Sequence, residues 1–269
     1  MRNPFNGAVS RVSLKPEDVD GIVFWSRDYR PMLDGLGLLS RMGYSFYCQF
    51  TIIGYPKWLD PGSPDIEAAC DTARRLCEEH GPDTVVWRYD PVILMNGMEE
   101  AWHLENFESL AGRLHGAVDE CVFSFLDFYA KFKTKLPAAL DEHGASLIKP
   151  GPGRLAAMAG RMKAAAQEKG MELSACCEPE DTRGDVRPSS CVDARRLSRI
   201  SGKALAGAPK NPSRKYCECT SAKDIGGYDT CPAGCLYCYA NRSRKLAARN
   251  RGLIKESSPG LWPSTVAGH

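Results

Sequence analysis

The sequence predicts an α/β fold, an incomplete (β/α) TIM-like barrel with parallel strands and a C-terminal cysteine-rich extension. Short apolar runs alternate with amphipathic stretches along most of the chain. The runs are apolar almost without a break, as in strands whose two faces are both covered. Five or six such strand–helix units favour a barrel over an open, doubly wound sheet.

The predicted strands share a short apolar core and cover residues 21–25, 45–53, 84–90, 121–127 and 171–178. Helices are predicted over 63–80, around 102–114 and over 153–169. The first helix is expected to begin with Ser63 as N-cap and Pro64 at its first position. Its apolar stripe carries Cys70 and Cys77, so these two thiols are predicted to be core residues rather than ligands.

The composition limits the classes of protein to which this chain can belong. The 269 residues are 43% hydrophobic and 25% charged, with a net charge of +2. No apolar run has the length of a membrane span, and the N-terminus lacks the apolar stretch of a signal peptide. We expect a cytoplasmic protein without a membrane partner. The near-neutral charge gives no general argument for binding nucleic acid.

Two units are expected along the chain. Residues 1–203 carry the strand–helix alternation, and residues 204–269 hold a linker and a cysteine-rich tail that packs back on the barrel. The linker, 204–213, and a second stretch, 137–152, are rich in small and helix-breaking residues. Both stretches are predicted to be loops.

Polar residues gather where the predicted strands end. Arg88 and Asp90 end the third strand and Asp127 ends the fourth. Functional side chains of parallel α/β folds lie at this edge, so the three are candidate catalytic residues. Arg88 and Asp90 are two positions apart, which places both on one face of the strand. The alternative is that these are ordinary loop residues and helix caps.

Eight of the twelve cysteines lie between Cys176 and Cys238. Clustered cysteines in a reducing compartment indicate metal or redox chemistry rather than disulfides. Cys231, Cys235 and Cys238 have C-x3-C-x2-C spacing. Three thiolates can hold three irons of a [4Fe-4S] cube and leave the fourth iron open. A closed zinc ribbon that also uses the Cys217-x-Cys219 pair is the alternative.

This spacing resembles that of the radical S-adenosylmethionine enzymes. The resemblance implies that Cys231, Cys235 and Cys238 bind the cluster and that its open iron binds S-adenosylmethionine. Tyr237 stands where that superfamily has an aromatic neighbour of the adenine, and Tyr237 and Tyr239 are the cofactor-binding candidates. An electron donor such as flavodoxin or ferredoxin would be a partner. Here the motif follows the whole barrel, whereas most of the superfamily carries it after the first strand.

A wider resemblance covers nearly the whole chain. The segments RNPFN, DVDGIVFWSRD, YCQFTIIGY, VVWRYDPVIL, FSFLDFY, CECTSAKDIGGYDTC and GCLYCYAN resemble the bacterial family catalogued as domain of unknown function 1848. That family is marked by C-terminal cysteines similar to the radical S-adenosylmethionine motif. Its members carry a further segment ahead of RNPFN. The resemblance therefore implies that a first β-α unit is missing here and that one edge of the barrel is left open.

Five further thiols, from Cys176 to Cys219, suggest a second metal centre. Its predicted ligands are Cys191, Cys217, Cys219 and one of the adjacent Cys176 and Cys177, with Cys177 as the first choice. The centre would be a second iron–sulfur cluster or zinc. The alternative is that some of these cysteines are merely buried thiols.

The basic run of Arg242, Arg244, Lys245, Arg249 and Arg251 is predicted to form a helix. The leading hypothesis is a radical S-adenosylmethionine-type iron–sulfur enzyme that acts on an unknown substrate. One rival is a non-enzymatic module in which zinc or a cluster joins the tail to the barrel. A second rival is a cluster-containing nucleic-acid repair or modification protein, which depends on the basic run alone.

Overall fold

A computed structural model describes residues 11–127, 135–205, 207–212 and 214–255. The RNPFN stretch lies outside these residues. The core is one sheet of six parallel strands whose order in space is their order in the sequence. The strands are β1 (Ile22–Ser26), β2 (Phe46–Thr51), β3 (Val85–Val92), β4 (Glu120–Phe125), β5 (Glu172–Ala175) and β6 (Arg187–Pro188).

The predicted α/β class and parallel strands are confirmed. Each strand pairs with the next, and the order never reverses, unlike that of a doubly wound sheet. Among the described residues β1 and β6 do not pair with each other. The sheet therefore has two edges, and closure into a barrel is not part of the described structure.

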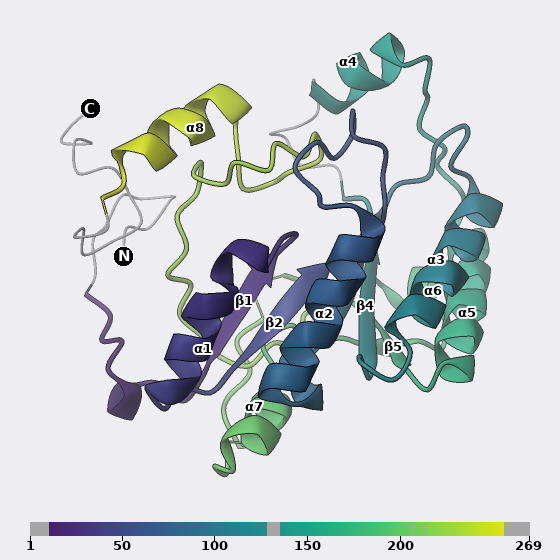
Figure 1. The fold of residues 1–269 in the computed structure, drawn as a ribbon. Coiled ribbons are helices and arrows are strands. Elements are labelled where there is room, and N and C mark those ends of the chain that lie inside the picture. The colour runs from purple at the N-terminus through teal and green to yellow at the C-terminus, as the bar shows by residue number, and fades with distance from the viewer. Residues whose placement is uncertain (1–10, 128–134, 206, 213, 256–269) are drawn as a thin grey trace.

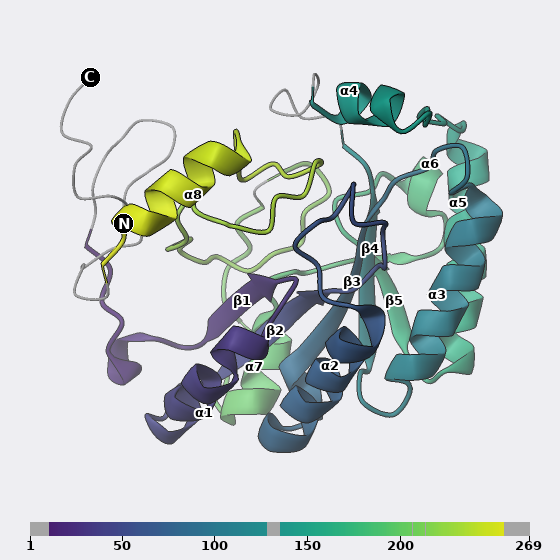
Figure 2. The ribbon, with the colours of Figure 1, turned by 45° about the horizontal axis from the view of Figure 1, so that its top comes forward.

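Helices follow the strands in the expected alternation. They are α1 (Leu33–Arg41), α2 (Ile66–His80), α3 (Glu100–Leu114), α4 (Lys135–Glu142), α5 (Pro152–Glu168), α6 (Glu180–Arg183), α7 (Ala194–Ser201) and α8 (Arg244–Leu253). Figure 1 shows α1, α2, α3 and α5 along one face of the sheet. In Figure 2, α8 and α4 lie beyond one end of the strands and α7 lies at the other.

The two faces of the sheet differ because side chains alternate along each strand. Phe46, Trp87 and Phe123 point to the helix-covered face and belong to the main hydrophobic core. Tyr47 and Val122 point the other way, into a smaller cluster with Leu197 of α7. This second face is covered by α7 and by the cysteine-rich segments, whereas the first is covered by long helices.

Two local predictions were wrong. Helix α2 begins at Ile66 with Asp65 as N-cap, because Ser63 is held in a turn in which its hydroxyl and amide both donate to the Asp60 carbonyl. The stretch 137–152 is not wholly a loop, since α4 covers its first part and buries Leu136 and Leu140.

Other local predictions are confirmed. Cys70 is buried in the core and Cys77 packs against it. The basic run from Arg244 to Arg251 lies in α8, with the Ser243 side chain capping its first turn, and Arg242 precedes the helix. No helix in the described ranges combines the length and the apolar composition needed to cross a bilayer.

His103 of α3 is a polar side chain that forms its hydrogen bonds inside the main core. It is fully buried, and its Nε2 lies 3.0 Å from the Ile93 carbonyl oxygen, so Nε2 carries the proton. Its Nδ1 accepts from the Tyr89 hydroxyl at 2.9 Å. Burial lowers the pKa of His103 to about 4, because the charged imidazolium would lose its hydration.

The free energy of unfolding should therefore fall as the pH is lowered from about 6.5 to about 4. In that window the unfolded chain binds a proton at His103 and the folded chain does not, which costs up to about 3 kcal/mol. Urea unfolding at a series of pH values would measure this loss. His103→Gln should reduce the dependence of the unfolding free energy on pH, whereas His115→Gln, at an exposed site, should not change it. The same pH dependence in wild type and both variants would contradict the assignment of the effect to His103.

Candidate functional site

A polar network lies on the second face of the sheet, where β2, β3 and β4 end. Arg88 is buried, and its guanidinium donates to the Asp90 carboxylate at 2.7 Å and to the Gln49 side chain at 3.2 Å. The Ser124 hydroxyl donates to the other oxygen of Asp90. Burial opposes the charge of Arg88, but Asp90 and the neighbouring thiols hold the pKa of its guanidinium above the ordinary value. Arg88 and Asp90 thus lie together on one strand face, as predicted.

Asp127 lies apart from this pair. Its exposed carboxylate forms an ion pair with Arg214 of the tail at 2.7 Å. The structure therefore brings Arg88 and Asp90 together but places Asp127 at the outer edge, where the tail crosses the end of β4.

Five cysteines come together beside Arg88, and we call them the thiol cluster: Cys176, Cys177, Cys191, Cys217 and Cys219. The Sγ atoms of Cys176 and Cys191 are 3.3 Å apart, and those of Cys176 and Cys177 are 3.9 Å apart. The side chain of Cys217 interacts with both Cys177 and Cys219, and Cys219 interacts with Cys191. The five thiols thus form a closed ring of contacts between the end of β5, the segment after β6 and the tail.

The thiols of this ring differ in acidity. Hydrogen bonds from Cys176 and Cys219 to Cys191 lower its pKa well below the usual value, and Arg88 at 3.1 Å acts in the same direction against the effect of burial. The hydrogen bond from Cys176 likewise lowers the pKa of Cys177. The ring therefore favours a thiolate at Cys191, next to a buried positive charge.

A second cysteine site, the cysteine loop 231–238, packs against the loop that follows β2. The Leu236 amide donates to the Leu59 carbonyl at 3.1 Å, and the Asn241 side chain donates to the Cys231 carbonyl at 2.7 Å. A Cβ atom at Gly62 would lie only 2.8 Å from the carbonyl carbon of Ala233. Glycine is therefore required at position 62 for the two backbones to approach.

Tyr237 anchors this loop from inside. Its ring is buried, its hydroxyl donates to Asp60 at 3.1 Å, and the Arg27 guanidinium lies 5.1 Å from the ring centroid. Arg27 also pairs with the same oxygen of Asp60, whose carboxylate is 1% exposed. Tyr55 meets Tyr237 edge to face at 5.9 Å.

The three cysteines of the loop differ in exposure. Cys231 is exposed, and Cys235 and Cys238 are half-buried. Burial raises the pKa of the Cys235 thiol, with Arg27 acting in the opposite direction. Tyr239, one residue after Cys238, is exposed, whereas Tyr237 points into the protein. Across the ranges that the structure describes, no three His, Cys, Asp or Glu side chains surround one point as they would around a metal ion.

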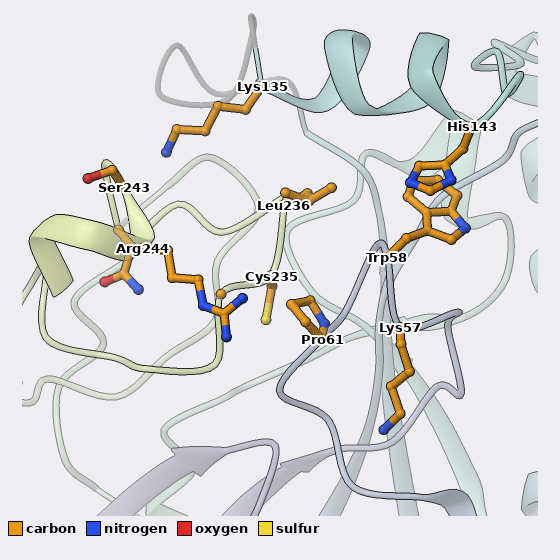
Figure 3. Close-up of a pocket in the computed structure, with 11 residues that line it drawn as sticks. Lys57, Trp58, Pro61, Lys135, His143, Cys235, Leu236, Ser243 and Arg244 are labelled. Atoms are coloured by element: carbon orange, nitrogen blue, oxygen red, sulfur yellow. The ribbon is translucent and has the colours of Figure 1, made fainter. Parts of the chain in front are cut away.

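A cavity of about 500 Å³ opens beside Cys235 (Figure 3). Its lining includes Lys57, Trp58, Lys135, His143, Cys235 and Arg244. The rings of Trp58 and His143 stack at 4.5 Å on one side. Space for a small molecule therefore adjoins the cysteine loop.

Asp60 is the site residue that the sequence did not reveal. It lies in the loop after β2, where a single aspartate between Leu59 and Pro61 has no spacing that marks it. The only available signal was its position after a predicted strand, which it shares with many loop residues. Arg27, its partner, is one of the polar residues at the end of β1.

Comparison with known proteins identifies the family of the chain and a distant solved structure. The model of the family described as a domain of unknown function (DUF1848) matches residues 1–240. No curated protein matches the chain. A crystal structure of a putative alpha-L-fucosidase from Bacteroides thetaiotaomicron is similar at 12% identity, over 77% of this chain and 83% of that one. Its TM-score of 0.29 is too low to carry an argument.

Gly62→Ala should loosen the cysteine loop, because the new methyl group would overlap the backbone at Ala233. We expect a loss of about 1–3 kcal/mol in the stability of this contact. Hydrogen exchange at the Leu236 amide, which bonds to Leu59, would measure it.

The matched control is Gly112→Ala on α3, where nothing lies within 4 Å of the new methyl group. This control should leave exchange at Leu236 unchanged. Unchanged exchange in Gly62→Ala as well would mean that the loop does not depend on the close approach at residue 62.

Proposed function

The chain belongs to the DUF1848 family, and we propose that this member is a radical S-adenosylmethionine-type iron–sulfur enzyme on an incomplete TIM-like barrel. Its [4Fe-4S] cluster would be held by Cys231, Cys235 and Cys238. The observation that carries the proposal is the docking of the cysteine loop beside a cavity at the end of the sheet where the strand-end side chains lie.

Thiols are the ordinary protein ligands of such a cluster. Three thiols lie in one loop whose backbone is held by Leu59 and Asn241, so the loop has a fixed shape before any ligand binds. Cys231 is exposed, which leaves one side open to solvent and to a small molecule. Held by these three cysteines, such a cluster would supply one electron for the cleavage of S-adenosylmethionine.

The chain's own residues would orient the reactants. Tyr237, Asp60 and Arg27 hold the cysteine loop on the body. Because the Tyr237 ring is buried among these partners, we propose an anchoring role for it and leave Tyr239 as the exposed aromatic candidate for the adenine. Arg88 and Asp90 would bind polar groups of the substrate.

The exposed basic side chains of α8 would suit an acidic electron donor such as a flavodoxin or ferredoxin. The same helix is the only support for the nucleic-acid alternative. The alternative of a purely structural metal module has its own support in the thiol cluster, where buried thiols join the tail to the sheet.

Anaerobic reconstitution should give about four irons and four sulfides per chain at the cysteine loop. Cys235→Ala should lose this iron, because two thiols cannot hold the cube. The matched control is Cys70→Ala, which removes a buried thiol of α2 outside the cysteine loop and should keep all the iron. Full iron retention in Cys235→Ala would show that the ligands are chosen wrongly.

Adding S-adenosylmethionine should change the visible absorption of the reconstituted protein, and a strong reductant should then release 5′-deoxyadenosine. The absorption change reports binding, and the released nucleoside reports cleavage. A reconstituted cluster that gives neither result would end the radical proposal. A colourless protein whose bound zinc is lost in Cys235→Ala would favour the structural module.

A further inference from the structure

The thiol cluster is the feature that the proposed function leaves unused. Its members come from three separate segments: Cys176 and Cys177 follow β5, Cys191 follows β6, and Cys217 and Cys219 belong to the tail. Cys176, Cys191 and Cys217 are each more than nine-tenths buried. Bringing five thiols from three segments into one ring of contacts is a specific arrangement, and hydrophobic packing alone does not require it.

We infer that the thiol cluster binds a single zinc ion through Cys176, Cys191, Cys217 and Cys219. Four thiolates around one zinc at about 2.3 Å form a tetrahedron whose sulfurs lie about 3.8 Å apart. Among these four cysteines, the Sγ atoms of Cys176 and Cys191 are 3.3 Å apart, which is close to that value. In an iron–sulfur cube each thiolate binds a different iron, so the cysteine sulfurs lie farther apart than this.

The thiols are in pairwise contact and do not yet surround one point. Side-chain rotation would bring these thiols onto a common ion, because the three segments that carry them are already side by side. The segments are fixed by backbone hydrogen bonds, from Thr220 to Val192 at 2.9 Å and from Ser189 to Ala175 at 2.8 Å.

Charge supports the same assignment. Zinc with four thiolates carries a net charge of −2, which is costly to bury. Two arginines lie against the cluster: Arg88 is 3.1 Å from the Cys191 sulfur and Arg214 is 3.9 Å from the Cys176 sulfur. Each also pairs with a carboxylate, Arg88 with Asp90 and Arg214 with Asp127, and both place a positive charge next to the thiols.

The choice of Cys176 over Cys177 follows from position. Cys176 continues the face of β5 that points to Arg88, and its sulfur touches that of Cys191. Cys177 has a left-handed backbone, with φ at 60°, and its thiol contacts Cys217 of the tail and lies 3.9 Å from the Cys176 sulfur. A non-glycine residue in that conformation is strained, so the bend is a built feature of the site.

The test is the metal content of the full chain and of single variants. Wild type should hold about one zinc per chain. Cobalt(II) in its place should give the absorption of a tetrahedral thiolate site. Cys176→Ala and Cys191→Ala should bind cobalt more than about 100-fold more weakly, since even losing an outer partner costs 10–100-fold. Cys177→Ala should keep the metal and serves as the matched control.

The result is independent of the iron at the cysteine loop. Cys235→Ala should lose iron and keep zinc, while Cys191→Ala should lose zinc and keep iron. If one of the two proposed metal sites is absent, the evidence for the other is unaffected. Circular dichroism would confirm that each variant is folded. The cobalt spectrum of wild type tests the site even if a variant does not fold.

Three outcomes would overturn the inference. One is about eight irons per chain with no zinc, which would make the ring a second cluster. Another is a Cys176–Cys191 disulfide in the isolated protein, detected by its mass. The third is loss of metal from Cys177→Ala with retention in Cys176→Ala, which would reverse the ligand assignment.

Discussion

The buried carboxylate of Asp60 connects the segment after β1 with the cysteine loop. It is 1% exposed and contacts the guanidinium of Arg27 after β1 and the hydroxyl of Tyr237 in the tail. A buried ion pair adds little net stability, but losing one partner costs about 3–5 kcal/mol because the other charge is left unpaired. The arrangement therefore enforces one docked position for the tail.

The strand order explains why polar groups and thiols from distant parts of the chain meet. Parallel strands that follow one another in sequence bring their carboxyl ends to one edge of the sheet. The long helices cover one face, and the second face keeps Arg88 and Asp90 in a small cluster closed by α7 and the tail. A buried arginine on that face needs acceptors, and Asp90, Gln49 and Cys191 supply them.

The sequence predicts the structural features that depend on residues close together along the chain. Alternating apolar runs located the strands, and the apolar stripe of α2 identified Cys70 as a core residue. The pattern failed where a long-range contact intervened: Ser63 is held by Asp60 in a turn instead of capping α2. The buried position of Asp60 could not be predicted, because its partners Arg27 and Tyr237 are far away in sequence. No recognisable spacing links the three residues.

The two cysteine sites differ in exposure, and that difference fits the different roles proposed for them. The cysteine loop leaves Cys231 in contact with solvent and adjoins a cavity, so a ligand can reach it. The thiol cluster is mostly buried and lies against two arginines, so a metal bound there would have its coordination completed by protein. Open coordination suits chemistry and closed coordination suits structure. A closed site that joins β5, the segment after β6 and the tail would hold the covering of the second face in place, and with it the surroundings of Arg88.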